Sequence, residues 1–287
     1  MNFNAKKFKE IFKYADNLRY ICFAHVCTGW FLLTFCRVFT QLILRSCCTC
    51  VHFSVLKNMA HSNENVDFMK YAIEEAPAAA FYIPEYFNDK EEEFYTQQIY
   101  SAPAPKWTSL SARRLLNYGG IVGKKGLIQV NDIPFWLRAL MKRVCKSVPL
   151  FTPGNEPNHV LINEYLPGQG IMPHTDGPAY FPVVANITLG SHTVLDLYET
   201  ETKNYIGSFL LERKSLLIIS EQLYVNFQHG IKEVKEDEIS EKILNYKLCS
   251  EKYSSEEKIP RKTRISITIR NVPKTITAFA AVFNNRA

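Results

Sequence analysis

Short runs rich in apolar and β-branched residues, several of them alternating with polar residues, dominate the chain from residue 159 onward. Alternation with a period of two places every second side chain on the same face of a strand, and turn residues separate the runs. The pattern predicts β-strands over 159–165, 183–189, 193–198, 206–211, 215–220 and 263–272.

The region from residue 79 to residue 148 has a different pattern, which predicts one strand and two helices. The strand is expected at 81–84. Asn88 can cap a helix that begins near Lys90, because acidic residues fill its first turn. Apolar residues recur with helical spacing over 134–148, which predicts an amphipathic helix. We therefore expect a mainly β fold with supporting helices, in the form of a double-sheet barrel or jelly roll.

Residues 1–58 differ from the rest of the chain in charge and cysteine content. They hold eight Lys/Arg against two acidic residues, and six of the eight cysteines. We interpret them as an atypical basic, apolar, Cys-rich N-terminal extension that need not belong to the functional protein, and we expect the functional domain over 70–287. Residues 20–36 carry no charge, but this run is at the short limit of a membrane span, so no membrane association is expected.

Because basic residues and cysteines are concentrated in residues 1–58, the composition of the whole chain differs from that of the domain. The net charge of +6 comes from the extension, since the remaining chain balances 26 basic with 26 acidic residues, and it is weak support for nucleic-acid binding by the domain. Only Cys145 and Cys249 remain in the domain, which is typical of a reducing compartment and argues against a disulfide scaffold. Residues 233–262 are rich in charge and are expected to form an exposed insertion.

Two histidines and one aspartate are candidate metal ligands. His174 and Asp176 are two positions apart, so both project to the same side of extended backbone, and His229 ends a later β-rich run that contains Tyr224 and Phe227. Two imidazoles and one carboxylate on one face of an ion leave open positions, as in non-haem Fe(II) oxygenases. Taken singly, the first pair is more often a hydrogen-bonded turn and His229 a core histidine.

The strand over 264–270 favours the metal-site interpretation. Arg264, Ser266, Thr268 and Arg270 would share one face, with isoleucines on the other. If the polar face points into a barrel, the arginines need an anionic partner, because unpaired buried charge is costly. A dicarboxylate co-substrate would supply that partner, since arginine suits bidentate carboxylate binding. On a solvated surface the same pattern is an ordinary amphipathic strand.

Asn163 and Tyr165 also share a strand face and can donate hydrogen bonds to the same acid, although either fits an ordinary polar strand position. With them, the chain shows the order N-x-Y, H-x-D, H and R-x₅-R. This order resembles the AlkB family of Fe(II)- and 2-oxoglutarate-dependent dioxygenases. The resemblance also rests on 158–168 and 189–196, and it spans residues 79–273.

The resemblance implies a double-stranded β-helix, a cupin-like jelly roll, with Fe(II) bound by His174, Asp176 and His229. It implies 2-oxoglutarate and O₂ as co-substrates, with the distal carboxylate of 2-oxoglutarate on Arg264. The residues implied to form the co-substrate pocket are Asn163, Tyr165, Arg264, Ser266 and Arg270. Ser266 stands where the bacterial archetype of the family has asparagine, which leaves one hydrogen bond to the co-substrate in doubt.

The implied reaction hydroxylates a C–H bond while 2-oxoglutarate becomes succinate and CO₂, and from an N-methyl group it releases formaldehyde. The implied substrate is alkylated DNA or RNA, and we expect a monomer in the nucleus and cytoplasm. Two alternatives remain open. The balanced charge of the domain also permits a protein side chain as substrate, and a catalytically silent nucleic-acid-binding or scaffold protein could use the same fold.

Candidate substrate contacts are aromatic and basic residues that could hold an unstacked base. Trp107 and Tyr118 are more often packing groups, and the pair Arg113-Arg114 could be a solvated helix face. The candidates are Lys106, Trp107, Arg113, Arg114, Tyr118, Tyr180 and Phe181.

Overall fold

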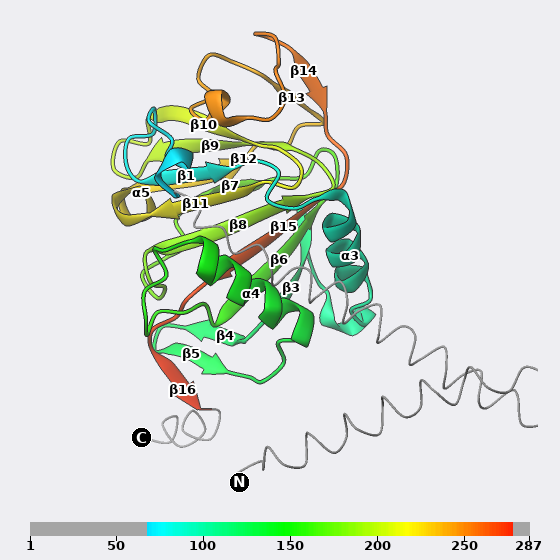
Figure 1. The fold of residues 1–287 in the computed structure, drawn as a ribbon, viewed down its shortest axis with the longest axis vertical. Helices are drawn as coiled ribbons and strands as arrows, with labels where there is room; N and C mark the ends of the chain where they lie inside the picture. Colours follow the sequence, from blue (N-terminus) through cyan, green and yellow to red (C-terminus); the bar gives the residue numbers. More distant parts are fainter. Residues whose placement is uncertain (1–67, 278–287) are drawn as a thin grey trace, which may run out of the picture. The chain divides into compact units, whose positions relative to one another are not determined.

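The computed structural model describes residues 68–277, and most of the strands in this part of the chain belong to two antiparallel sheets (Figure 1). The strands of the larger sheet are β1 (Ala80–Ile83), β2 (Thr108–Leu110), β3 (Arg113–Tyr118), β6 (His159–Tyr165), β8 (Val183–Leu189), β11 (Leu216–Ser220) and β15 (Arg264–Arg270). The strands of the smaller sheet are β7 (Ile171–His174), β9 (Thr193–Glu199), β10 (Tyr205–Leu211) and β12 (Phe227–Ile231). Their orders are β1-β11-β8-β15-β6-β3-β2 and β10-β9-β12-β7.

One hydrophobic cluster lies between the two sheets and joins them. The larger sheet contributes Tyr82, Val184 and Leu217 to this cluster, and the smaller sheet contributes Leu197 and Phe209. All five side chains are at most 5% exposed. Two antiparallel sheets that share one core form a jelly roll, so the predicted mainly β fold class is confirmed.

Helices support the larger sheet, as expected. They are α3 (Asp89–Tyr100), α4 (Phe135–Ser147) and the short α5 (Glu221–Asn226), with 3₁₀ turns at η1 (Phe68–Tyr71), η2 (Ala104–Lys106) and η3 (Tyr246–Leu248). Asn88 caps α3 in a reciprocal capping box with Glu91, with both hydrogen bonds at 3.0 Å. Leu137, Leu140 and Val144 form the fully buried face of α4. Figure 1 shows α3 and α4 beside the larger sheet.

The strand β15 alternates as predicted, but both of its faces are buried. Its three isoleucines are at most 2% exposed, and Arg264 and Arg270 are 3% and 5% exposed. In the register with β6, Arg264 lies opposite Tyr165 and Ser266 lies opposite Asn163. Because Tyr165 belongs to the cluster between the sheets, the arginine face points into that space. The alternative of a solvated amphipathic strand is therefore wrong.

The segment before His229 differs from the prediction. Tyr224 belongs to α5, so the expected β-rich run is a short helix followed by β12, with His229 in the middle of the strand. Leu223 and Tyr224 are both buried while Val225 is 60% exposed, a pattern that suits a helical turn against the core better than strand alternation.

The segment after α3 also differs from the prediction. Arg113 and Arg114 lie on β3, so the reading of this pair as a helix face is wrong. A small third sheet, which the residue pattern did not predict, contains β4 (Gly120–Gly123), β5 (Gly126–Gln129) and β16 (Thr275–Thr277). Its strands are three or four residues long, so they carry little alternation that could be recognised in the sequence.

The charged segment 233–262 is anchored to β10. It contains β13 (Glu236–Glu238), η3 and β14 (Lys258–Pro260). The side chain of Asn245 donates to the carbonyl of Leu210 and accepts from its N–H, each over 2.8 Å. The carboxylate of Glu212 accepts from the backbone N–H groups of Ser250 and Glu251, each over 2.9 Å. Backbone and side-chain bonds therefore hold the segment against one edge of the smaller sheet.

Two expectations concern the N-terminal part of the chain and the membrane. The extension predicted over 1–58, with its uncharged run, lies outside the described residues. Within 68–277, none of the helices is long and apolar enough to cross a membrane.

Candidate metal centre and co-substrate pocket

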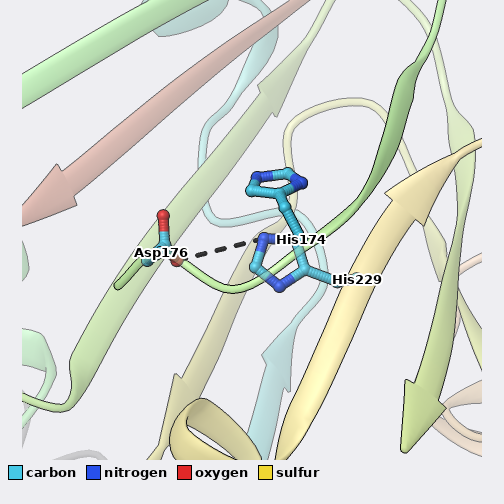
Figure 2. A group of neighbouring side chains, drawn as sticks. All are labelled: His174, Asp176 and His229. Carbon is cyan, nitrogen blue, oxygen red and sulfur yellow. Dashed lines mark ion pairs between the residues drawn. The ribbon is translucent and has the colours of Figure 1, made fainter. Parts of the chain in front are cut away.

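His174, Asp176 and His229 meet at one point on the smaller sheet (Figure 2). His174 ends β7, Asp176 follows it in the loop, and His229 is on β12. Because β7 and β12 pair with His174 opposite His229, the two ring centroids are 4.6 Å apart. One ligand atom from each of the three side chains lies within 4.8 Å of the others. The structure thus brings together the three residues that the sequence suggested as ligands.

Neighbouring groups fix the orientation of these side chains. Nδ1 of His174 is 2.8 Å from the carbonyl oxygen of Met172, so a proton on Nδ1 leaves Nε2 free for a metal. Nη1 of Arg270 donates to Oδ1 of Asp176 over 2.5 Å. The phenol of Tyr224 donates over 2.5 Å to the backbone carbonyl directly after Asp176, which holds the loop in place.

Burial and charge keep His229 and Asp176 in their metal-binding protonation states. Burial lowers the pKa of His229 to about 4, against the opposing effect of Asp176, so the imidazole is neutral near pH 7. Burial alone would raise the pKa of Asp176, but Arg270 and the two histidines outweigh that effect and hold the pKa below its ordinary value. Neutral imidazole and ionised carboxylate are the forms that bind a metal cation.

The donor set fits Fe(II). Two imidazole nitrogens and one carboxylate oxygen on one side of an ion form the facial arrangement of non-haem Fe(II) oxygenases, with the remaining positions open. The side chain of Asp176 is 8% exposed and that of His229 is 20% exposed, so the centre lies just below the surface.

Arg264 is a buried cation without an acidic partner. None of the ion pairs among residues 68–277 includes it. Its Nη2 donates to Oδ1 of Asn186 over 3.2 Å and to Oγ1 of Thr188 over 2.9 Å, while its Nε has no hydrogen-bond partner. Burial lowers the pKa of Arg264 to about 10. An unpaired buried charge is costly, so this environment fits an acid whose carboxylate would pair with Arg264.

Other predicted co-substrate residues share the face of Arg264. Asn163 and Tyr165 are 6% and 7% exposed and lie on the neighbouring strand β6. The guanidinium carbon of Arg264 is 5.7 Å from the centroid of the Tyr165 ring. Oδ1 of Asn163 accepts from Nε of Arg113 over 3.1 Å. Arg113, a substrate candidate in the sequence, is therefore placed beside the co-substrate residues.

Sequence reasoning did not select Asn186, Thr188 or His159 as site residues. Asn186 and Thr188 hold the guanidinium of Arg264, and their only signal in the sequence is that two polar residues two positions apart interrupt an apolar strand. His159 is 3% exposed, lies opposite Arg270 in the β6–β15 register, and has no hydrogen-bond partner for Nδ1. Burial, with a smaller contribution from Arg270, lowers the pKa of His159 to about 3.

Tyr180 is a substrate candidate that lies next to the metal-binding residues. Its ring centroid is 4.1 Å from the guanidinium carbon of Arg270, which pairs with Asp176, and 5.7 Å from the ring of His159. Phe181 beside it is half-buried, and its backbone N–H donates to the main chain at Asn271.

Lys106 and Tyr118 contact each other, and further contacts join Lys106 to Asp132 and Trp107 to Arg114. Nζ of Lys106 pairs with Asp132 over 2.5 Å and lies 4.4 Å from the centroid of the Tyr118 ring. The guanidinium carbon of Arg114 lies 4.2 Å from the centroid of Trp107. These contacts agree with the packing role that the sequence left open for Trp107 and Tyr118.

Comparisons with known proteins agree with this chemistry. The sequence model of the 2OG-Fe(II) oxygenase superfamily matches residues 52–270. A protein of Danio rerio, named Probable RNA/DNA demethylase ALKBH6, is 46% identical over 224 residues, which cover 74% of this chain and 94% of the relative. Uncharacterized protein L905 of Acanthamoeba polyphaga mimivirus is 33% identical over 145 residues, which cover 50% of this chain and 60% of the relative.

A solved structure of a 2OG-Fe(II) oxygenase family oxidoreductase from Burkholderia pseudomallei matches 73% of this chain and 92% of its own, with a TM-score of 0.49 and 12% identity. The superfamily match covers most of this chain, and the relative from Danio rerio matches over nearly its whole length. The chain therefore belongs to the AlkB family within the 2OG-Fe(II) oxygenase superfamily, and it is an Fe(II)- and 2-oxoglutarate-dependent dioxygenase.

Proposed function

We propose that this protein oxidatively removes alkyl groups from DNA or RNA. In this proposal His174, Asp176 and His229 hold Fe(II), and Arg264 binds the distal carboxylate of 2-oxoglutarate. One observation carries the proposal: a group of three metal-binding side chains on the smaller sheet is combined with a buried arginine without an acidic partner on the larger sheet.

The residues around Arg264 give the pocket its preference for a dicarboxylate. The unpaired guanidinium supplies the charge, and Asn163, Tyr165 and Ser266 supply hydrogen-bonding groups on the same strand faces. Arg270, which the sequence also suggested for this pocket, pairs with Asp176. Its role in the proposal is to orient the carboxylate that binds the metal.

When bound, Fe(II) with 2-oxoglutarate and O₂ supplies an oxidation that yields succinate and CO₂ and hydroxylates one C–H bond of the substrate. A hydroxylated N-methyl group then leaves as formaldehyde. The side chains of this protein orient the reactants, and in this proposal Tyr180, whose ring centroid lies 4.1 Å from the guanidinium carbon of Arg270, packs against the substrate group.

Two observations support nucleic acid as the substrate. The relative from Danio rerio, 46% identical to this chain, carries the name Probable RNA/DNA demethylase. The ring of Tyr180 contacts Arg270, which pairs with Asp176, and an aromatic ring near the metal-binding residues can stack on an unpaired base.

A direct turnover assay tests the proposal. The full chain is incubated with Fe(II), 2-oxoglutarate and O₂ and with one of three substrates: an oligonucleotide with N-methylated bases, the same oligonucleotide without methyl groups, or an N-methylated peptide. Mass spectrometry follows loss of the methyl group, and succinate and formaldehyde are measured in parallel. We expect methyl loss from the methylated oligonucleotide, with succinate formed in step.

The matched control is Asp176→Asn, which has nearly the same shape but provides a weaker metal ligand, and it should be inactive. Turnover of the peptide and of neither oligonucleotide would show that the substrate is a protein. Tight binding of the methylated oligonucleotide without turnover would instead identify a silent binding protein.

A further inference from the structure

Asn186 lies at the centre of the polar face that β8 and β15 share. In the register of the two strands, Asn186 is opposite Thr268 and Thr188 is opposite Ser266. The remaining residues of β8 are apolar apart from Thr188. Asn186 is therefore a polar residue in a buried strand, placed beside the arginine that lacks an acid.

The carboxamide of Asn186 makes three hydrogen bonds to β15. Its Oδ1 accepts from Nη2 of Arg264 over 3.2 Å. Its Nδ2 donates to Oγ of Ser266 over 2.7 Å and to Oγ1 of Thr268 over 3.0 Å. The oxygen must face the guanidinium, because arginine can only donate, so the orientation of the amide is determined by Arg264.

This arrangement determines where the hydroxyl groups of Ser266 and Thr268 can donate their hydrogens. Both hydroxyl oxygens already accept from Asn186, so each hydroxyl hydrogen must point elsewhere. Ser266 and Thr268 are 3.5 Å apart, so one hydroxyl can donate to the other, and the second hydrogen remains free. A free donor beside an unpaired guanidinium is the environment that a carboxylate needs.

The second consequence concerns charge. Asn186 and Thr188 satisfy Nη2 of Arg264 with neutral acceptors, so they fix the guanidinium without neutralising it. An aspartate at position 186 could fill the same space, but it would supply the counter-ion from within the protein. The amide therefore keeps the positive charge available for a ligand.

We propose that Asn186 is a positioning residue for the co-substrate, which holds Arg264 in place with its charge uncompensated and turns a hydroxyl of the Ser266–Thr268 pair into a donor for the same carboxylate. This inference rests on the assignment of Arg264 to 2-oxoglutarate in the proposed function. It also accounts for Ser266, which stands where the family archetype has asparagine. The amide that the archetype has at this position is here supplied by Asn186 of the neighbouring strand, which bonds to Ser266.

The test compares two acids in Asn186→Asp. Calorimetric titrations of the Fe(II)-loaded full chain, without O₂, use 2-oxoglutarate and 2-oxobutyrate, a 2-oxo acid without the distal carboxylate. In the variant, the introduced carboxylate would pair with Arg264 and repel the distal carboxylate of the ligand. We expect affinity for 2-oxoglutarate to fall by at least about tenfold, as loss of a charge-assisted bond implies, with affinity for 2-oxobutyrate nearly unchanged. Equal losses for the two acids, or no loss for either, would overturn the inference.

Two further variants keep the result interpretable. Asn245→Asp makes the same chemical change in a buried amide that anchors segment 233–262 to β10, and it should lower stability without changing the ratio of the two affinities. Asn186→Ser introduces no charge, and its shorter side chain cannot donate to both hydroxyls. It should lower affinity selectively for 2-oxoglutarate, by roughly fivefold, as loss of a neutral hydrogen bond implies. If Asn186→Asp does not fold, equal losses for both acids in Asn186→Ser refute the inference.

The wild-type protein separates this inference from the proposed function. If the wild type does not prefer 2-oxoglutarate to 2-oxobutyrate, the assignment of Arg264 fails, and the inference about Asn186 fails with it. If the wild type has the preference and Asn186→Asp keeps it in full, only the role of Asn186 is wrong.

Discussion

Arg270 donates a hydrogen bond of 2.5 Å to Asp176, although 94 positions separate the two residues in the sequence. The bond connects the last residue of β15 in the larger sheet with the loop after β7 in the smaller sheet. Both side chains are buried, at 6% and 8% exposed. The carboxylate of the candidate metal ligand is therefore oriented by a residue of the opposite sheet.

Loss of the Arg270 side chain should weaken metal binding. Arg270→Gln removes the charge that orients and ionises Asp176, and changes of this kind next to metal ligands typically cost about 10- to 100-fold in affinity. Competitive titration of Fe(II) without O₂ measures the effect. Arg213→Gln is the control, because Arg213 also pairs with carboxylates but is 48% exposed. Unchanged metal affinity in Arg270→Gln would contradict this role.

Removal of Asp176 should destabilise the metal-free protein more than removal of His174. Asp176→Ala leaves the guanidinium of Arg270 buried without its counter-ion, which typically costs about 3–5 kcal/mol in the free energy of unfolding. His174→Ala removes a half-buried side chain and leaves no charge unpaired. Urea unfolding with a chelator present compares the two variants, and equal losses would show that the ion pair does not form in solution. Both variants should lose turnover.

Arg264→Met should weaken the binding of 2-oxoglutarate without lowering the stability of the ligand-free protein. Affinity for 2-oxoglutarate should fall about 10- to 150-fold, because one charge-assisted interaction is lost. The free energy of unfolding without ligand should stay the same or rise, because a buried cation without an acid is replaced by an apolar side chain of similar length. Calorimetry with 2-oxoglutarate and urea unfolding measure the two effects. A large loss of stability would show that Arg264 has an ionic partner within the protein.

His159 should make the protein less stable as the pH falls below neutral. Burial lowers the pKa of His159 from 6.5 to about 3. Between these values the unfolded chain binds a proton that the folded chain does not, so stability is complete above pH 6.5 and decreases as the pH falls toward 3. Between pH 7.5 and pH 5.5 this group should remove about 1.4 kcal/mol from the free energy of unfolding. Urea unfolding at pH 7.5 and at pH 5.5 measures this loss of stability. The same two measurements on His159→Phe should show a smaller loss, and an equal loss would contradict the lowered pKa of His159.

Local patterns in the sequence predicted the elements whose signals are local. The alternation over Arg264–Arg270 has a period of two, so it identified both faces of β15, and the cap at Asn88 marked the start of α3. The contact between Arg270 and Asp176 could not be derived in this way, because it depends on how the two sheets face each other. For the same reason the contact of Asn186 with Arg264 could not be derived, because 78 positions separate the two residues.

The errors have physical causes as well. The apolar side chains around Tyr224 were read as a strand, but they belong to the helical turn α5, which packs Leu223 and Tyr224 against the core. The basic pair Arg113-Arg114 suggested a helix face because nothing in its composition marks a strand, and cross-strand bonds to Asn163 and Glu164 give it its place. Each residue was assigned from its sequence neighbours, whereas its structure depends on a distant strand.

The central claim is that His174, Asp176 and His229 bind Fe(II) and that Arg264 binds the distal carboxylate of 2-oxoglutarate at the same site. Titration of the metal-free protein with Fe(II) and then 2-oxoglutarate, without O₂, tests it most directly. A weak visible charge-transfer band should appear on addition of 2-oxoglutarate, should be absent in Asp176→Asn, and should need a higher 2-oxoglutarate concentration in Arg264→Met. Folded wild-type protein that gives no such band, or a variant with an unaltered band, would contradict the account.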